Sequence, residues 1–254
     1  MPEWLVLALA MVAVCTVIVL VTFVQHRRIG VDDDPSETPD VIEYITMMIG
    51  VVYAIVLGLA MAGVWEARSA AEEHVHAEAR ALHEVHERVR VYPAEVRDRI
   101  RADVNAYVGH VIDVEWKKMV DTGGLTERGD ALMERIRHDV TDYQPRTDFE
   151  AQAYQPLMDQ VTIADQARTG RGEAAQPTMP GVVWFGLIVG AVVTLGMMFA
   201  LQIRRTAREL VLAGLFSVLI AFLLFLVWDF DTPYGRSVTS GGEPFLSLFP
   251  KLGP

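Results

Sequence analysis

Apolar and charged positions are segregated along this chain into long blocks. Four runs contain no Asp, Glu, Lys or Arg, namely 4–24, 44–64, 182–201 and 210–228. At ~1.5 Å of rise per residue, a helix of roughly 20 residues crosses the ~30 Å hydrocarbon layer of a membrane. The pattern therefore predicts four transmembrane helices.

The first apolar run has an alternative interpretation as a cleaved signal peptide. No basic residue precedes it, and it is longer than the apolar region of most signal peptides, so we expect it to be retained. The lone Cys15 lies within this run, so the chain cannot form an intramolecular disulfide.

The charged segment 65–180 separates the second and third apolar runs, and its breakers divide it into helices. Pro93 suits the first turn of a helix, Gly123 with Gly124 ends it, and Thr147 with Glu150 forms a capping box. The predicted helices are 93–121, 127–143 and 147–168, followed by a loop over 169–180.

Apolar residues recur at helical spacing in these predicted helices. The stripes are Val96, Ile100, Val104, Tyr107 and Val111, and then Leu132, Ile136 and Val140. Such stripes must be covered, so we expect the helices to bundle into a membrane-extrinsic domain, with packing against neighbouring subunits as a second use of the same faces.

No helix breaker marks the border between the second apolar run and the charged segment. The sequence GLAMAGVWEARSAAEEHVH changes from apolar to charged within a few residues, without Pro or a Gly cluster. Backbone hydrogen bonds of a helix are satisfied equally well in lipid and in water. We predict one helix from about Tyr44 to Val91, with Trp65 as an interfacial anchor.

These expectations define an all-α membrane protein with a helical domain inserted between its second and third spans. The predicted parts are 1–64 (two spans), 65–180 (extrinsic helices), 181–230 (two spans) and 231–254 (a C-terminal tail).

Composition supports this class and excludes others. The chain of 254 residues is 52% hydrophobic and only 22% charged, which is too apolar for a soluble domain of this size. Its net charge of −11 argues against binding to nucleic acid. GxxxxGK[ST], GxSxG and HExxH motifs are absent, so we expect neither enzymatic activity nor a cofactor.

Positive charge in the short connections indicates an orientation in the plasma membrane. These connections contain Arg27, Arg28, Arg204, Arg205 and Arg208. Short loops rich in Arg stay in the cytoplasm. The termini and the segment 65–180 are then expected outside the cytoplasm.

Small residues fall at intervals of four in two of the predicted spans. The second span carries Gly50, Ala54, Gly58 and Ala62, and the third carries Gly186 and Gly190. Such ladders allow close approach of another helix. The alternative is that the ladder of the second span faces the lumen of a pore.

Acidic residues lie just beyond the presumed outer ends of the spans. Glu66 follows the second span, and Asp229 and Asp231 follow the fourth. An acidic ring at a pore mouth enriches cations, although charges also commonly follow a span because water begins there. The spans themselves contain no charged residue, which argues against a proton relay.

The histidine-rich run EEHVHAEARALHEVHE is the strongest candidate for metal chemistry. Glu72, His76, His83 and Glu87 lie near one line of the predicted helix. His76 and His83 are two turns, ~10 Å, apart, so one ion cannot bridge them within one helix. We expect a solvated and partly ion-paired face that responds to protonation, rather than a metal site.

Three stretches resemble a bacterial membrane family identified as bestrophin-like. They are IGVVYAIVLGLAMAGVWEARSAAEEHVHAEARALHEVHERV, NAYVGHVIDVEWKKM and VLIAFLLFLVWDFDTPYGRSVTSGGEPF. The most specific positions are Trp65, Glu66, Tyr107, Glu115, Trp116, Asp231, Pro233, Gly235, Glu243, Pro244 and Phe245.

The resemblance implies an oligomeric, pentameric chloride channel whose second membrane helix lines the pore with bulky apolar and aromatic side chains. This sequence departs from that pattern, because its second span lacks Phe and has Tyr53 as its one central aromatic residue. Its acidic outer charge also disfavours anions, and bestrophins keep their helical domain in the cytosol.

The sequence thus predicts a homo-oligomeric ion channel whose second span surrounds an axis within the lipid bilayer. The expected gate residues are Ile49, Tyr53, Leu57 and Met61, and the expected mouth residues are Glu66, Asp229 and Asp231. The alternative is a non-transporting scaffold or sensor whose extrinsic domain binds a partner, a proton or a metal.

Overall fold

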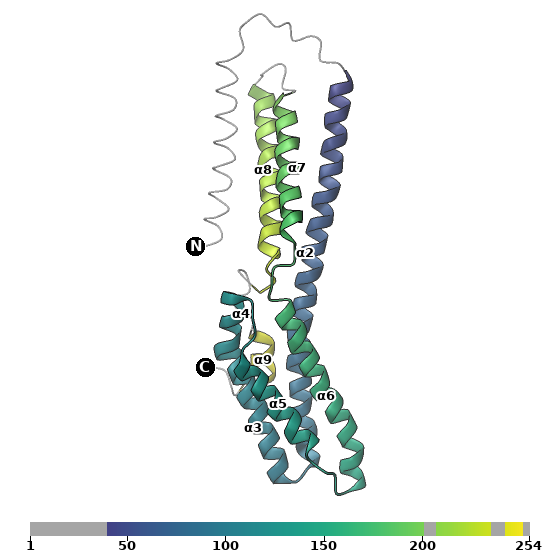
Figure 1. The fold of residues 1–254 in the computed structure, drawn as a ribbon, viewed down its shortest axis with the longest axis vertical. Coiled ribbons are helices and arrows are strands. Elements are labelled where there is room, and N and C mark those ends of the chain that lie inside the picture. Colours follow the sequence, from purple (N-terminus) through teal and green to yellow (C-terminus); the bar gives the residue numbers. More distant parts are fainter. Residues whose placement is uncertain (1–39, 201–206, 235–241, 251–254) are drawn as a thin grey trace, which may run out of the picture. The chain divides into compact units, whose positions relative to one another are not determined.

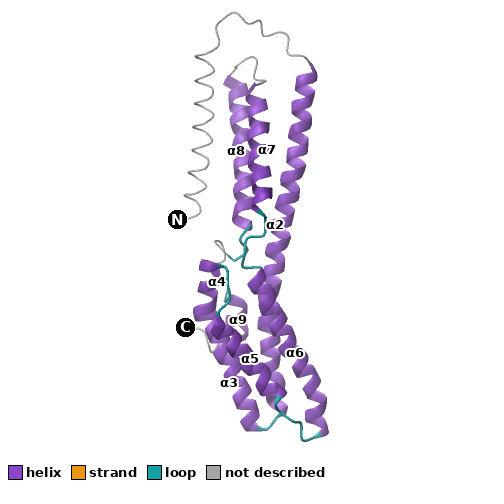
Figure 2. Cartoon of the chain, in the orientation of Figure 1, coloured by secondary structure: helices purple, strands orange, loops and turns teal. Residues whose placement is uncertain are grey.

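The computed structural model describes residues 40–200, 207–234 and 242–250, and every regular element in these ranges is helical (Figures 1 and 2). The α-helices are α2 (Asp40–Arg88), α3 (Ala94–His110), α4 (Trp116–Thr122), α5 (Glu127–Thr141), α6 (Asp148–Glu173), α7 (Gly181–Ala200), α8 (Ala207–Phe230) and α9 (Glu243–Leu248). The all-α class expected from the sequence is confirmed.

Three helices of the described part, α2, α7 and α8, are long and apolar enough to cross a membrane. They contain the second, third and fourth predicted spans. The first predicted span, 4–24, lies outside the described residues, as do Cys15, Arg27, Arg28, Arg204 and Arg205. The layout of four spans therefore stays a prediction.

The helix α2 runs without interruption from Asp40 to Arg88 and is followed by a 3-10 turn, Val89–Val91. This confirms the single helix predicted across the border between apolar and charged sequence. Trp65, the predicted interfacial anchor, is exposed, and its ring packs edge-on against Phe230 with 5.6 Å between centroids.

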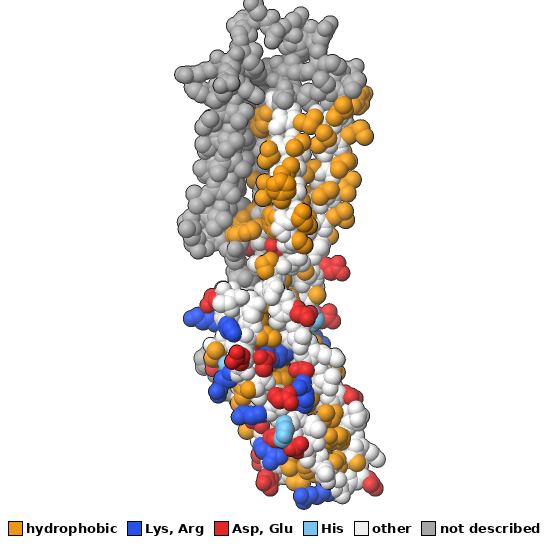
Figure 3. All heavy atoms as spheres, viewed as in Figure 1, with side chains coloured by type: hydrophobic (Ala, Val, Ile, Leu, Met, Phe, Trp, Pro, Cys, Tyr) orange, Lys and Arg blue, Asp and Glu red, His pale blue; other side chains and the backbone are white. Residues whose placement is uncertain are grey.

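The chain divides into two compact units. The membrane unit comprises the residues up to Trp65 together with Met179–Asp231. The extrinsic unit comprises Glu66–Thr178 and the chain from Thr232 onward. Hydrophobic side chains dominate the visible surface of α2, α7 and α8 in the membrane unit, whereas charged side chains are spread over the extrinsic helices (Figure 3).

The extrinsic unit buries the apolar stripes predicted from the sequence. Ile100, Val104, Tyr107 and Val111 are fully buried, and they share one core with Leu132, Ile136 and Val140. The predicted bundling is thus confirmed, because each helix covers the stripes of the others.

The loop predicted over 169–180 is wrong in its first part, because α6 continues to Glu173. Two buried arginines, Arg168 and Arg171, hold this last part of the helix through ion pairs. Gly170 in this part of the helix allows close packing, because a Cβ atom there would lie 2.6 Å from the His74 ring. Tertiary contact therefore overrides the low helix propensity of glycine.

The predicted helix over 93–121 is divided by one wider turn. Residues Val111–Glu115 form a π-helical turn between α3 and α4, and Gly123 ends α4 with a φ of 70°. A left-handed residue at the end of a helix is most easily a glycine.

Thr147 caps α6 as predicted, its hydroxyl accepting a hydrogen bond from the Glu150 backbone nitrogen at 3.2 Å.

The C-terminal tail contains a short helix that the sequence did not predict. In α9, Phe245 is fully buried in the core of the extrinsic unit. Tyr234, before α9, donates a hydrogen bond of 2.7 Å from its hydroxyl to the backbone oxygen of Ala71 on α2. The tail from Thr232 onward is thus part of the extrinsic unit.

Candidate functional site

One face of α2 is covered within the membrane unit. Tyr53, Leu57 and Val64 are buried against α7 and α8. The Tyr53 hydroxyl donates to the backbone oxygen of Leu187 at 3.2 Å, and its ring closely approaches Gly190, where a Cβ would lie 2.6 Å from the ring. Two predicted gate residues, Tyr53 and Leu57, therefore point into the core of the membrane unit.

The opposite face of α2 is uncovered by the described chain. Met48, Val51, Ile55 and Leu59 on this face are between 55% and 69% exposed. We call these four residues the uncovered face. The other two predicted gate residues, Ile49 and Met61, are half-buried.

The small-residue ladder of α2 packs little against its own described chain. Ala54, Gly58 and Ala62 are exposed, and a Cβ added at Gly50 or Gly58 would meet nothing within 4 Å. The ladder of α7 differs, because Gly190 contacts the Tyr53 ring while a Cβ at Gly186 would meet open space.

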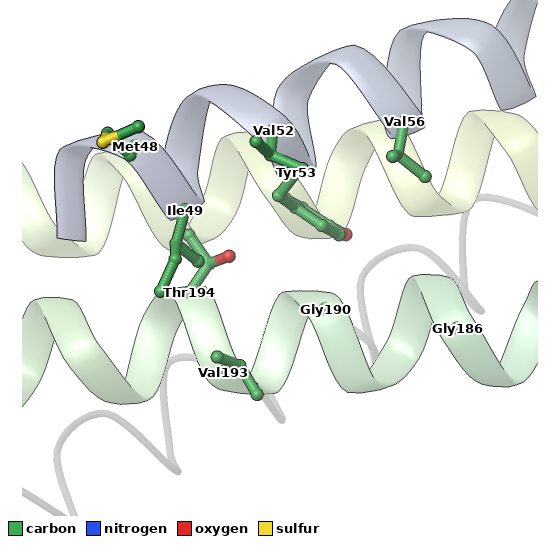
Figure 4. A pocket seen from close by; sticks show the side chains of 9 residues that line it. All are labelled: Met48, Ile49, Val52, Tyr53, Val56, Gly186, Gly190, Val193 and Thr194. Carbon is green, nitrogen blue, oxygen red and sulfur yellow. The ribbon is translucent and has the colours of Figure 1, made fainter. Parts of the chain in front are cut away.

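Two apolar grooves flank Tyr53. The groove between α2 and α7 has a volume of about 390 Å³, and Figure 4 shows the side chains that line it. Its lining includes Thr194, whose buried hydroxyl oxygen has no hydrogen-bond partner in the described part of the chain. The groove between α2 and α8 has a volume of about 500 Å³ and is lined by Gly50, Ala54 and Gly58.

The three acidic residues predicted at the mouth have different surroundings. Glu66 is exposed, and Asp229 is half-buried with an Oδ1 atom that has no partner among the described residues. Asp231 is only 7% exposed and accepts hydrogen bonds from the Met179 backbone nitrogen at 2.7 Å and the Trp184 indole nitrogen at 3.0 Å. Its carboxylate therefore fixes the chain around the start of α7.

The four candidates for a metal site are not brought together. Glu72 pairs with Arg68 at 3.5 Å, and His76 is exposed. The His83 ring packs edge-on against Phe249, and Glu87 lies 3.4 Å from His86. Within the described ranges, no group of three His, Cys, Asp or Glu residues is placed to hold a metal ion.

A buried ionic cluster in the extrinsic unit joins α2, the π-helical turn and α6. Glu78, Glu115 and Arg171 are fully buried, and Arg168 is 2% exposed. We call these four residues the ionic cluster. Its two guanidinium groups and two carboxylates balance in charge, so the attraction between them offsets the cost of desolvating buried ions.

Both arginines hold a carboxylate with two nitrogens. Arg171 donates to Glu78 at 2.6 and 3.1 Å and also reaches Glu115 at 2.8 Å. Arg168 donates to the two oxygens of Glu115 at 3.0 and 3.2 Å. Bidentate pairing of this kind fixes orientation as well as distance.

Neutral groups complete the cluster. The Tyr107 hydroxyl donates to Glu78, and the Thr126 hydroxyl donates to Glu115 at 2.6 Å. Burial by itself would raise the pKa of Glu115, but Arg171, the Thr126 hydroxyl and Arg168 hold that pKa below its ordinary value. Burial, followed by the charge of Glu78, raises the pKa of Tyr107 well above 10.

Local backbone features make room for Glu115. In an α-helix, residues four apart are rotated by about 40° around the axis relative to one another. The wider π-helical turn reduces this rotation, so Val111, Glu115 and Met119 all face the core and are buried. Gly129 is necessary beside it, because a Cβ there would lie 2.1 Å from the Glu115 Oε2 atom.

Sequence reasoning missed the ionic cluster. The sequence pattern predicts Arg168 at the end of a helix and Arg171 in a loop, and so does not indicate that they share a face. A spacing of three residues puts the two side chains on one face of a helix, which was the available signal. Glu115 is singled out only by the family resemblance, and Tyr107 also by its place in an apolar stripe.

Solved structures of similar fold cover nearly the whole chain. One is a mutant of a bacterial bestrophin homologue from Klebsiella pneumoniae, with TM-score 0.66, 12% identity and coverage of 97% of this chain and 98% of that chain. A second mutant of that homologue has TM-score 0.67, 12% identity and coverages of 97% and 96%. A third structure, described as a membrane protein, has TM-score 0.68, 12% identity and coverages of 99% and 99%.

At such identity the likeness establishes the fold alone. No curated protein matches the chain. A family model, the bestrophin-like domain, matches residues 6–240, which is most of the sequence. The chain therefore belongs to the bestrophin-like family of membrane proteins.

Proposed function

We propose that the protein is a homo-oligomeric ion channel of the plasma membrane in which α2 surrounds a central axis. The observation that carries this proposal is the uncovered face of α2, which stands opposite the face packed on α7 and α8. Family membership and the shared fold support it. The family resemblance suggests five subunits, which native mass spectrometry would count.

The geometry refines which side chains would gate such a channel. Tyr53 and Leu57 are held inside the subunit, so they would act by fixing α2 from behind. Large side chains of the uncovered face, such as Ile55 and Leu59, would narrow a pore along the axis. Ile49 and Met61 are half-buried and line the grooves beside Tyr53. A ring of apolar side chains can gate by excluding water.

The charges near the ends of the membrane helices favour cations. Glu66 is exposed and is the first charge after the apolar part of α2. Asp229 and Asp231 would add negative potential at the end of α8, although Asp231 is occupied by two hydrogen bonds. A mouth lined with one sign of charge concentrates ions of the opposite sign.

Planar bilayer recordings of the purified protein would test this function. We expect conductance, with a reversal potential in a salt gradient that indicates cation preference. Glu66→Gln should shift the reversal potential toward zero, whereas Glu95→Gln, an exposed residue of α3, should leave it unchanged. Absence of conductance at every voltage, pH and salt composition would refute the channel.

Accessibility to an impermeant thiol reagent would test the proposed orientation. With Cys15 replaced by Ala, single cysteines would be introduced as Ser36→Cys and Ser69→Cys. If the extrinsic unit lies outside the cytoplasm, only the second variant reacts in intact cells. Reaction of only the first would reverse the orientation.

A non-transporting sensor is the second candidate. The observation in its favour is the ionic cluster, which gives the extrinsic unit a rigid polar core suited to presenting a binding surface. A protein that binds a proton, metal or partner through this unit and shows no conductance would support this function over the channel.

A further inference from the structure

The end of the C-terminal tail is docked on the extrinsic bundle by two aromatic residues. Phe245 of α9 is fully buried, and Phe249, directly after α9, is 5% exposed. Both belong to the core that also contains Leu82 and Val85 of α2. Since α9 has only six residues, these side chains and not helix propensity must hold it in place.

The rings of His83 and His86 contact Phe249, and we call these two rings its seat. The rings of His83 and His86, one turn apart on α2, meet the Phe249 ring edge-on, with centroid distances of 5.8 and 6.0 Å. The Nδ1 atom of His83 is buried and has no hydrogen-bond partner among the described residues. The contact therefore suits neutral imidazole, because a proton added at this atom would place an unpaired charge in the packed site.

The charged groups around this seat do not supply the missing partner. On α2, Glu87 lies 3.4 Å from His86, and Glu84 is engaged with Arg88 at 2.9 Å. From α3, Arg101 donates to the backbone oxygen of His86 at 2.9 Å and opposes a second positive charge there. The sole charged residue of α9, Glu243, is at the other end of that helix.

We propose that α9 and Phe249 form a pH-sensitive latch, closed on the rings of His83 and His86 and opened by acid. Free imidazole titrates near pH 6.5. Burial, against the effect of Glu87, lowers the pKa of His86 in the closed state, so closure is complete above the pKa of the free ring and is lost as the pH falls below it. Tyr234, tied to Ala71, keeps the start of the tail attached at either pH.

The latch does not require that the protein conduct ions, so its test is independent of the proposed channel. Hydrogen exchange of the full-length protein in nanodiscs reports closure through two amides, Leu246 bonded to Gly242 and Phe249 bonded to Phe245. After correction for the intrinsic effect of pH, protection should fall between pH 8 and pH 5. The expected loss is roughly tenfold for each pKa unit by which closure disfavours protonation.

Replacing the two rings distinguishes opening of the latch from a general loss of structure in acid. His83→Phe with His86→Phe keeps aromatic contact, and His83→Gln with His86→Gln keeps polarity, so at least one pair should fold. Either folded pair should make the protection of α9 independent of pH. His76→Gln, an exposed histidine of the same helix, should retain the wild-type response.

The latch is overturned by either of two results. One is wild-type protection of α9 that does not change between pH 8 and pH 5. The other is a folded double variant whose α9 amides still respond to pH as the wild type does. Loss of protection in α3 at the same pH would also overturn it, because the opening would then be general.

Discussion

The two units of this protein differ in which side chains they bury and which they expose. In the membrane unit a small apolar core around Tyr53, Leu57 and Leu187 suffices, and many large apolar side chains stay exposed. In the extrinsic unit the apolar core is much larger, and yet it encloses four charged side chains. Each unit thus places some residues where an average soluble protein would not.

The difference follows from the solvent of each unit. Exposed Ile55 or Leu59 costs little where lipid or another apolar helix surrounds α2, since lipid tails are as apolar as leucine. Buried Glu78 and Arg171 are tolerable only because they are paired with each other. The apolar surface of the membrane unit therefore reflects its apolar environment. The buried ion pairs of the extrinsic unit instead reflect how its helices pack.

The largest effect is expected from breaking the ionic cluster. Arg171→Met removes one cation and leaves Glu78 without a positive partner in the core, while Glu115 keeps only Arg168. We expect a loss of about 3–5 kcal/mol in the stability of the extrinsic unit. Hydrogen exchange of α3 amides would measure it.

A matched control for this substitution is Arg135→Met. Arg135 forms an exposed ion pair with Asp103 at 2.8 Å. Its removal should cost less than about 1 kcal/mol. Equal losses for the two variants would contradict the distinction between buried and exposed pairs.

Acid should weaken the same cluster without changing the sequence. The pKa of Glu115 is lowered in the folded protein, against the effect of burial, by Arg171, Thr126 and Arg168. Its contribution is therefore complete above the unfolded pKa, about 4.3, and is lost as the pH falls through the lower folded value. The effect should be smaller than that of Arg171→Met, because a proton removes the charge of Glu115, whereas the mutation leaves Glu78 charged and unpaired in the core.

A pH series of denaturant titrations would measure this acid effect. The wild type should lose stability below about pH 4.3 more steeply than Glu115→Gln, which cannot titrate at that site. Parallel curves for the two proteins would show that other groups dominate.

Overpacking the membrane unit should have a moderate effect. Gly190→Ala would place a Cβ 2.6 Å from the Tyr53 ring, so α2 and α7 must separate or Tyr53 must move. We expect a cost of about 1–3 kcal/mol, measured as reduced thermal stability in detergent. Gly186→Ala, where a Cβ meets nothing within 4 Å, is the control and should be neutral or slightly stabilising.

The smallest effect is expected at the start of α7. Asp231→Asn keeps one acceptor oxygen and so loses one of the bonds from Met179 and Trp184. We expect a local loss of about 1 kcal/mol, seen as faster exchange of the Met179 amide. Asp229→Asn should leave that exchange unchanged, because its Oδ1 has no partner in the described part.

The secondary structure was largely predictable from the sequence because its signals are local. Local patterns predict the continuous α2, the Thr147 cap and the apolar stripes of α3 and α5. The end of α6 and the existence of α9 were not, because both depend on partners distant in sequence. Gly170 meets His74, and Phe245 is buried in a core built by other helices.

The candidate site shows the same limit. Spacing placed Tyr53 and Leu57 on one face of α2, but it could not tell whether that face meets an axis or its own subunit. Likewise, the sequence does not distinguish Glu66 from Asp231. Glu66 is exposed, whereas Asp231 accepts hydrogen bonds from Met179 and Trp184. Which atoms a side chain meets depends on the packing of other helices.

The sequence by itself determined the membrane class, the all-helical composition and the unbroken α2, because hydrophobic length and helix signals act within one segment. The tertiary structure alone decided which face of α2 is covered, how Arg168 and Arg171 share Glu115, and what holds Phe249. The physical reason is that desolvation and charge pairing depend on groups that come together only when distant segments pack.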